Sequence, residues 1–332
     1  MAIRKFGVIG AGAWGTALAN VVAANGAASV IWAREDDVVA SINHQHRNPM
    51  FLPNVEISPH VRATSDLANA CNAEALLFVA PAQHVRAVAE QAAPYIRDGL
   101  PVVLCAKGIE LGSNALLSQV LHEAAPQALP AVLSGPTFAD EVARGLPTAV
   151  TLACADRGVG EDLVKSLGSA TFRPYLSTDV VGAQIGGALK NVLAIAAGIV
   201  SGRGLGENAK AAIITRGLAE MLRFGEAMGG KGATLMGLSG LGDLVLTCGS
   251  AKSRNHALGL ALARGEAAGD FLGARKSVAE GAYTAAAVVA IAQEKKIDLP
   301  ICCAADAILN HSVGIEHAIE ALLNRPFRSE TG

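Results

Sequence analysis

The chain has 332 residues, of which 51% are apolar and 17% are charged, and its formal net charge is -2 at pH 7. A chain of this length and apolar content can bury two cores and is not disordered. The nearly balanced charge, without blocks of like charge, argues against a nucleic-acid surface.

The first half of the chain alternates strand and helix signals. Continuous apolar runs separated by helix-length segments indicate a parallel sheet with helices on both faces. Right-handed crossovers make such a sheet doubly wound, as in Rossmann-type domains. The expected strands are 5–10, 29–33, 75–80, 102–106, 131–134, 148–153 and 172–175, and the expected helices between them include 16–25 and 85–95.

From about residue 180 the chain shows helix signals without a comparable strand series. The expected helices are 183–200, 210–229, 255–264, 282–295 and 304–310, separated by glycine-rich loops such as 201–206 and 237–242. We therefore expect an α/β dinucleotide-binding domain at 1–182 and an all-helical substrate domain at 183–332. The active site should lie between them, at the carboxyl ends of the strands.

The first strand runs into Gly10-Ala11-Gly12-Ala13-Trp14-Gly15, and a helix signal follows. In this context Gly10 allows a tight turn, Gly12 lets a pyrophosphate approach the backbone, and Gly15 lets helix and strand pack closely. The helix N-terminus then stabilises the phosphate charge. The alternative is an ordinary glycine turn between a strand and a helix.

Arg34 stands just beyond the second strand, where NAD sites usually carry an acidic residue for the ribose 2′-hydroxyl. A guanidinium suits a 2′-phosphate, so we expect NADP(H) to be preferred and NAD(H) to be possible. Glu35 and Asp36 follow directly and weaken this prediction. The alternative is that Arg34 is a solvated loop charge.

Two lysines occur where chemistry is expected. Lys107 follows the fourth strand, so it should lie where cofactor and substrate meet, although a snorkelling surface lysine is the alternative. Lys190 lies in a nearly continuous apolar helix, where burial would lower its pKa and suit it to acid/base catalysis. The alternative for Lys190 is a structural lysine paired with a carboxylate. Asn191 is placed to hold a hydroxyl or carbonyl group.

Two further segments carry polar groups in the helical half. Asp243 follows Gly240-Leu241-Gly242 and precedes an apolar run, so it is either a site carboxylate or only a helix N-cap. Ser253 should cap the helix that follows, and Arg254 adds a forked cation beside the free amides of that helix. This combination predicts an anion site. The segments together predict an NAD(P)-dependent enzyme acting on a small phosphorylated substrate.

Location and metal content follow from absences in the sequence. The N-terminal segment lacks the apolar stretch of a signal peptide, and no run reaches about 18 apolar residues, so neither secretion nor a membrane span is expected. The six cysteines include no CxxC pair and the eight histidines no HExxH motif. They favour buried thiols in a reducing cytoplasm over disulfides, and no metal site is expected.

Seven stretches closely resemble, in order, the bacterial NAD(P)-dependent glycerol-3-phosphate dehydrogenases, which supply a phospholipid precursor. Ala13 stands where relatives often have a hydroxyl residue, which is a minor departure. The matching stretches are 10–19, 105–110, 134–142, 188–192, 240–244, 253–255 and 278–281.

The resemblance implies interconversion of sn-glycerol 3-phosphate and dihydroxyacetone phosphate, with Lys190 as the acid/base. In the mechanism that we expect, Asp243 and Asn191 orient Lys190 and the substrate oxygens. It implies substrate contacts from Lys107, Gly135, Thr137, Asp243, Ser253, Arg254 and Asn255. It implies cofactor contacts from Gly10, Gly12, Ala13, Trp14, Gly15, Arg34, Lys107, Ala139, Arg254, Val278 and Glu280. Gly135, Thr137, Ala139, Val278 and Glu280 rest on the resemblance alone.

Two rival interpretations remain open. One is a hydroxyacid dehydrogenase or ketopantoate-type reductase, which would bind a carboxylate in place of the phosphate. The other is a non-catalytic NADPH sensor, against which the presence of Lys190 and Asp243 argues. A homodimer is a further expectation.

Overall fold

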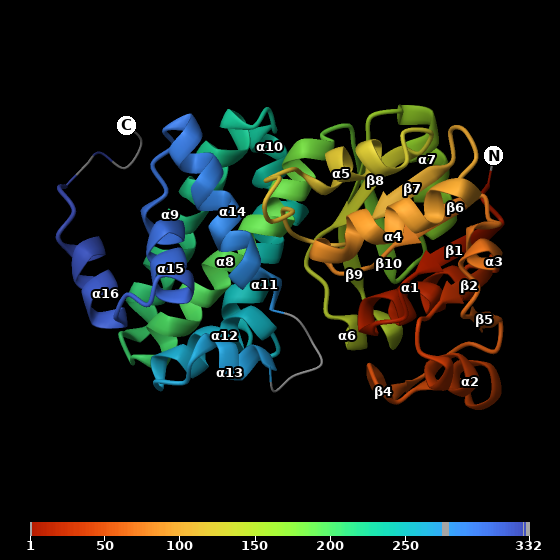
Figure 1. Cartoon of the computed structure of the whole chain (residues 1–332), viewed down its shortest axis with the longest axis horizontal. Helices are drawn as coiled ribbons and strands as arrows, with labels where there is room; N and C mark the ends of the chain where they lie inside the picture. The colour runs from red at the N-terminus through yellow and green to blue at the C-terminus, as the bar shows by residue number, and fades with distance from the viewer. Residues whose placement is uncertain (1, 274–278, 328, 330–332) are drawn as a thin grey trace.

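The computed structural model describes residues 2–273, 279–327 and 329. Figure 1 shows a sheet-containing half and a helical half side by side. All named strands of the described chain end by Ser177, so the predicted change from α/β to all-helical structure is confirmed.

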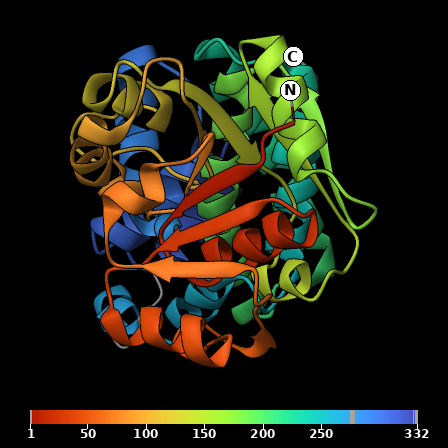
Figure 2. The same cartoon turned by 90° about the vertical axis from the view of Figure 1, so that its right-hand side faces the viewer.

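The first half is built on an eight-stranded sheet in the order β10-β9-β8-β7-β6-β1-β2-β5. Strand β1 lies between β6 and β2, which places the end of β1 at the point where the strand order reverses. Figure 2 shows β1, β2 and β5 running side by side in the same direction. The strands are β1 (Lys5–Ile9), β2 (Ala28–Trp32), β5 (Val61–Thr64), β6 (Ala75–Phe78), β7 (Pro101–Leu104), β8 (Leu129–Ser134), β9 (Thr148–Cys154) and β10 (Phe172–Ser177).

The sheet departs from the sequence prediction in two respects. Strand β9 pairs antiparallel with β8, so β9 and β10 run against the other six strands. Alternation of strands and helices does not determine the direction of an edge pair, which is why the sequence predicted a wholly parallel sheet. Strand β5 and the hairpin β3 (Arg47–Asn48) and β4 (Leu52–Glu56) were also missed, because these segments are short and largely polar.

Short helices connect the strands of the first half and cover the sheet. Strand β1 leads directly through the glycine turn into α1, and α6 follows β8 by a short turn. These helices are α1 (Ala13–Ala24), α2 (Asp36–Gln45), α3 (Leu67–Cys71), α4 (Val85–Ala92), α5 (Leu117–Ala124), α6 (Ala139–Ala143) and α7 (Arg157–Leu167), with the 3₁₀ turns η1 (Ala82–His84) and η2 (Ala93–Tyr95).

The second half is organised around α8 (Val180–Gly202), which is buried along most of its length. The expected division after residue 182 falls inside the first turn of this helix. Residues 238–242 form a π-helical turn instead of the predicted loop. The other helices are α9 (Gly206–Ala227), α10 (Gly232–Leu235), η3 (Leu238–Gly242), α11 (Asp243–Gly249), α12 (Arg254–Ala263), α13 (Ala268–Gly273), α14 (Glu280–Lys295), α15 (Pro300–Asn310) and α16 (Ile315–Leu323).

Glycines let neighbouring helices approach α8 closely. A Cβ built on Gly259 of α12 would lie 2.1 Å from the Ile195 carbonyl oxygen, and one built on Gly186 would lie 2.5 Å from the Ser239 carbonyl oxygen. Side chains larger than hydrogen would therefore push α12 and η3 away from α8. Lys190, near the middle of α8, forms its hydrogen bonds with α11.

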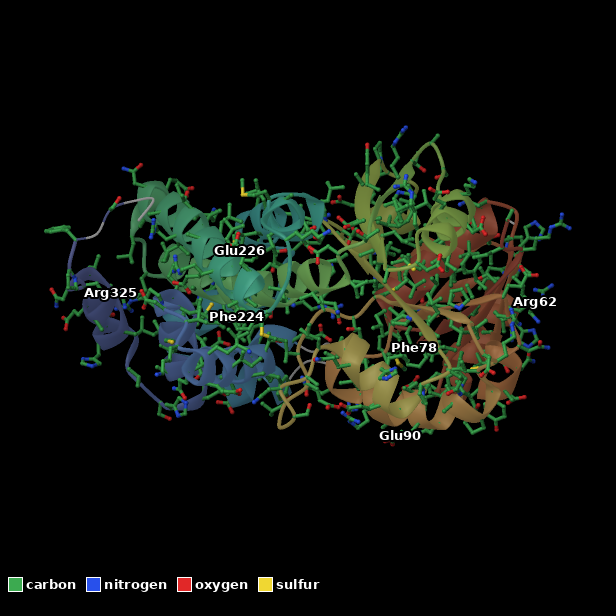
Figure 3. The ribbon with its side chains drawn as sticks, turned by 90° about the horizontal axis from the view of Figure 1, so that it is seen from above. Arg62, Phe78, Glu90, Phe224, Glu226 and Arg325 are labelled. Carbon is green, nitrogen blue, oxygen red and sulfur yellow. The ribbon has the colours of Figure 1, made fainter. Side chains whose placement is uncertain are left out.

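Each half has its own apolar core. Figure 3 shows Phe78 within the sheet half and Phe224 within the helical half, with Arg62 and Arg325 at opposite outer ends. Phe78 and Phe224 are both fully buried. Five of the six cysteines are buried and free, as expected, whereas Cys303 is exposed.

Two segments of the described chain are long and apolar enough to cross a membrane by length and composition. In α8 the most apolar window is 83% buried inside the protein, as is usual for a core helix. The second segment, Gly232–Gly249, is 39% buried and contains the buried Asp243.

Candidate active site

Lys107, Lys190 and Asp243 form one buried cluster between the two halves. The Lys190 ammonium Nζ lies 2.9 Å from Asp243 Oδ1, and the Lys107 ammonium Nζ lies 2.6 Å from Asp243 Oδ2. The Asp243 side chain is 0% exposed, and those of Lys190 and Lys107 are 10% and 14% exposed. Lys107 is therefore not a surface lysine, and both lysines retain a small face toward solvent.

The cluster shifts the protonation equilibria of its members. Burial lowers the pKa of Lys190 to about 8, and repulsion from Lys107 adds to this while Asp243 opposes it. Burial by itself would raise the pKa of Asp243, but the two ammonium groups outweigh it and hold that pKa below its usual range. Lys190 can thus gain or lose a proton near neutral pH beside a permanently charged carboxylate.

Asp243 is the first residue of α11, yet its side chain does not cap that helix. Both carboxylate oxygens point to the lysines instead, so the alternative of a simple N-cap is wrong. Thr247, one helical turn later, donates to Asp243 Oδ1 at 3.2 Å and accepts from Lys190 Nζ at 3.0 Å. Thr247 was not among the predicted site residues, although its i,i+4 spacing from Asp243 on a helix is the signal that would have found it.

Asn191 binds neighbouring protein groups with both ends of its side-chain amide. Its side-chain amide donates to the Lys107 carbonyl at 3.2 Å and its oxygen accepts from Asn255 at 2.8 Å. The Asn255 oxygen in turn accepts from the Gly281 amide at 3.1 Å. In the described structure Asn191 forms no hydrogen bond with Lys190, so it fixes the backbone at Lys107 and joins α8, α12 and α14.

The segments that follow the parallel neighbours β7 and β8 meet at this cluster. Gly135 follows β8 directly, and its carbonyl accepts from Lys107 Nζ at 2.9 Å. Its φ is +157°, and an added Cβ would lie 2.9 Å from the Val150 Cα, so the backbone here needs glycine. The Thr137 hydroxyl donates to the same carbonyl at 3.3 Å. Gly135 and Thr137, which were expected at the site from the resemblance alone, therefore lie beside Lys107.

The anion site predicted at residues 253–255 has the expected local geometry. Ser253 is the N-cap of α12, and its hydroxyl accepts from the His256 amide at 3.2 Å. Arg254 is exposed at the first helical position and forms no side-chain hydrogen bond or salt bridge with the rest of the described chain. The surrounding protein still removes part of the water around its guanidinium and so lowers its pKa, while the charge of Glu280 opposes this shift. The guanidinium is thus free to bind an anion at the helix N-terminus.

The glycine turn after β1 has the shape of a phosphate cradle. Gly10 has φ +117°, and a Cβ on Gly15 would lie 1.9 Å from the Gly10 carbonyl oxygen, so both positions need glycine. Gly12, the N-cap of α1, has no atom within 4 Å of its Cβ position. Ala13 begins α1, and the neighbouring Trp14 indole nitrogen is buried without a partner in the described chain. An open turn beside an unpaired donor fits a dinucleotide pyrophosphate.

The remaining cofactor candidates are spread around the same edge of the sheet. Arg34 lies beyond β2 with its side chain 84% exposed, and its guanidinium Nη2 lies 3.3 Å from Glu35 Oε1. Ala139 begins α6, just after Thr137. The Glu280 carboxylate accepts from the Ala82 amide at 2.9 Å, which ties α14 to the segment after β6. Val278 lies outside the described residues.

A doubly wound sheet, a glycine turn at its switch point and a buried lysine of lowered pKa at the strand ends define the class of dinucleotide-dependent oxidoreductases. Two family models match, described as the N-terminus of NAD-dependent glycerol-3-phosphate dehydrogenase over residues 5–159 and its C-terminus over residues 179–320. The chain belongs to the NAD-dependent glycerol-3-phosphate dehydrogenase family.

Individual relatives agree with this assignment. The glycerol-3-phosphate dehydrogenase (NAD(P)+) of Parvibaculum lavamentivorans is 57% identical over 331 residues, covering 100% of this chain and 99% of the relative. A crystal structure of glycerol-3-phosphate dehydrogenase from Coxiella burnetii is 38% identical, covers 97% of this chain and 99% of its own, and has a TM-score of 0.92. A ketopantoate reductase from Ralstonia eutropha, at 17% identity and a TM-score of 0.60 over 95% of this chain and 99% of its own, shares only the fold.

Proposed function

We propose that the protein interconverts sn-glycerol 3-phosphate and dihydroxyacetone phosphate by hydride transfer with NAD(P)(H). The observation that carries the proposal is the placement of Lys190 beside Asp243 and Lys107, with the free Arg254 guanidinium nearby in sequence at the start of α12. Oxidation of NADPH and of NADH with dihydroxyacetone phosphate as acceptor tests it. Turnover of 2-keto acids but not of the triose phosphate would contradict it and favour a ketopantoate-type reductase.

In the proposed mechanism the nicotinamide supplies or accepts the hydride when bound, and the protein handles charge and protons. Lys190 Nζ donates a proton to the oxygen that develops negative charge, and it takes the proton back in the oxidation direction. Asp243 and Thr247 hold that ammonium in one position. Arg254 and the N-terminus of α12 bind the substrate phosphate, which fixes the reacting carbon within reach. Lys107 supplies a second positive charge to the substrate oxygens.

Cofactor selection gives the first prediction. Arg34→Ala should raise the Michaelis constant for NADPH more than that for NADH, because only NADPH carries a 2′-phosphate for the guanidinium to bind. We expect the parent protein to use NADPH at least as well as NADH. Steady-state kinetics with both cofactors on parent and variant check this. Equal changes for the two cofactors would show that Arg34 is a solvated charge.

Recognition of the phosphate gives the second prediction. Losing a charge-assisted hydrogen bond costs about 1.5–3 kcal/mol, so Arg254→Ala should lose roughly 10- to 150-fold in kcat/KM for dihydroxyacetone phosphate. The loss for unphosphorylated dihydroxyacetone should be small, because that substrate has no phosphate to bind. Lys252→Ala is a neighbouring control, since Lys252 forms ion pairs with Asp140 and Glu141 across the two halves. A loss that is equal for both substrates would contradict the assignment of Arg254.

Several wider expectations remain proposals. We propose that residues 1–182 bind the dinucleotide and residues 183–332 the substrate, which binding of NADPH to variants of each half would test. We also propose a cytoplasmic homodimer without a membrane span, supplying glycerol 3-phosphate for phospholipid synthesis. Light scattering of the purified protein and fractionation of the source cells check the oligomeric state and the location.

A further inference from the structure

A polar hairpin between α2 and β5 packs against the glycine turn. Residues 46–58 interrupt the alternation of sheet strands and helices, because they contain the separate antiparallel pair β3 and β4. Two asparagines tie this hairpin to α1. Asn20 on α1 donates to the Glu56 carbonyl at 3.1 Å and accepts from the Ser58 amide at 2.8 Å. The second asparagine, Asn48, belongs to the hairpin itself and reaches the turn.

Asn48 is completely buried and uses both ends of its side-chain amide. Its Nδ2 donates to the Ala11 carbonyl at 2.8 Å and to the Thr16 hydroxyl at 2.9 Å. Its Oδ1 accepts from the Phe51 amide at 3.2 Å, which determines which end of the side-chain amide faces the turn. The Thr16 hydroxyl also donates to the Ala11 carbonyl, at 3.4 Å. The Ala11 carbonyl thus accepts from two side chains inside the protein.

The direction of this carbonyl matters for anion binding. Ala11 lies between Gly10 and Gly12, and an anion cradle requires the amides of the turn to face the ligand and the carbonyls to face away. The peptide between Ala11 and Gly12 is free to rotate once its carbonyl is released, because a glycine accepts a wide range of φ. A carbonyl that lost its buried donors would gain hydrogen bonds to water by turning outward. It would then present a negative dipole to the bound phosphate.

We propose that Asn48 is a positioning residue for the cofactor pyrophosphate, acting by holding the Ala11 carbonyl inward so that the glycine turn keeps its anion-binding shape. The inference rests on the dinucleotide part of the proposed function, but it does not depend on the substrate. It assigns a role to the hairpin at residues 46–58, which is to support the turn from the side opposite the ligand.

The test measures cofactor binding by the full chain in the absence of substrate. The fluorescence of NADPH or of NADH reports the binding. Asn48→Ala should raise the Kd of both cofactors by at least about fivefold, because the buried Ala11 carbonyl loses its shorter hydrogen bond and keeps only the longer one from Thr16. The factor should be the same for NADPH and NADH, since both carry the pyrophosphate. Thr16→Val should give a smaller rise in both Kd values, because Asn48 still holds the Ala11 carbonyl. This second variant keeps the proposal testable if Asn48→Ala does not fold.

The matched control is Asn20→Ala, which breaks the other link between the same hairpin and α1 without touching the turn. It should lower the thermal unfolding temperature but leave both Kd values within twofold of the parent. The proposal is overturned if folded Asn48→Ala binds both cofactors like the parent, if only NADPH is affected, or if Asn20→Ala weakens binding equally. Failure of the parent to reduce dihydroxyacetone phosphate would refute the proposed substrate while leaving this binding test intact.

Discussion

Lys190→Ala should lower turnover of dihydroxyacetone phosphate by about 10²- to 10⁴-fold, the usual contribution of a general acid/base. Its ammonium is the group in the buried cluster whose pKa, at about 8, suits proton exchange near neutrality. The fold should survive the change, because Lys107 still lies 2.6 Å from the Asp243 carboxylate. Cofactor affinity should change little, since the glycine turn and Arg34 belong to the other half. Turnover, NADPH binding and thermal unfolding of one preparation check these three expectations together.

Lys190→Arg is the informative companion variant. A guanidinium keeps the positive charge beside Asp243 but holds its proton at any usable pH, so it cannot act as the base. It should preserve the unfolding temperature without restoring the rate. The structural alternative, in which Lys190 only balances Asp243, predicts that Lys190→Arg is active and that Lys190→Ala is destabilised by about 3–5 kcal/mol. A stable Lys190→Ala variant with turnover near that of the parent would exclude the catalytic assignment.

The parts of the site that the sequence predicts are those whose meaning is local. The glycine turn is recognisable because a strand, three glycines and a helix must follow one another for a phosphate to be bound. Lys190 stands out because a charged side chain in an apolar helix is costly unless it has a partner or a task. Ser253 predicts the start of a helix, and in the structure α12 begins directly after it. Each of these signals lies within about ten residues.

The features that escaped prediction depend on contacts between distant segments. Asn48 lies 37 residues from Ala11, and its neighbours in sequence give no sign that it is buried. The partners of Asn191 are set by the packing of α8, α12 and α14, so its amide holds a backbone carbonyl instead of Lys190. The antiparallel direction of β9 is likewise a property of the sheet edge. For Asp243 the local pattern fits a helix cap as well as a buried counter-ion. The positions of Lys107 and Lys190 in the structure show that it is a counter-ion.

Asp243→Asn should be nearly as damaging as loss of Lys190, for an electrostatic reason. The carboxylate accepts from both lysines, at 2.9 Å and 2.6 Å, and an uncharged amide would leave two buried ammonium groups facing each other. We expect kcat/KM at pH 7.5 to fall by on the order of 10²-fold, because Lys190 would no longer be held protonated in place. The unfolding free energy should fall by up to about 3–5 kcal/mol. The fall is smaller if Lys190 loses its proton, because a neutral amine no longer repels the Lys107 ammonium.

The pH dependence separates this electrostatic role from a purely structural one. Reduction of dihydroxyacetone phosphate needs protonated Lys190, so kcat/KM of the parent should be level below pH 8 and fall above it, while oxidation of glycerol 3-phosphate should rise with pH over the same range. Attraction by Asp243 opposes the lowering of the Lys190 pKa, so removing its charge should lower that pKa further. The alkaline fall of the reduction profile should therefore move to lower pH in Asp243→Asn. A variant that loses activity but keeps the position of that fall would show that Asp243 does not set the protonation of Lys190.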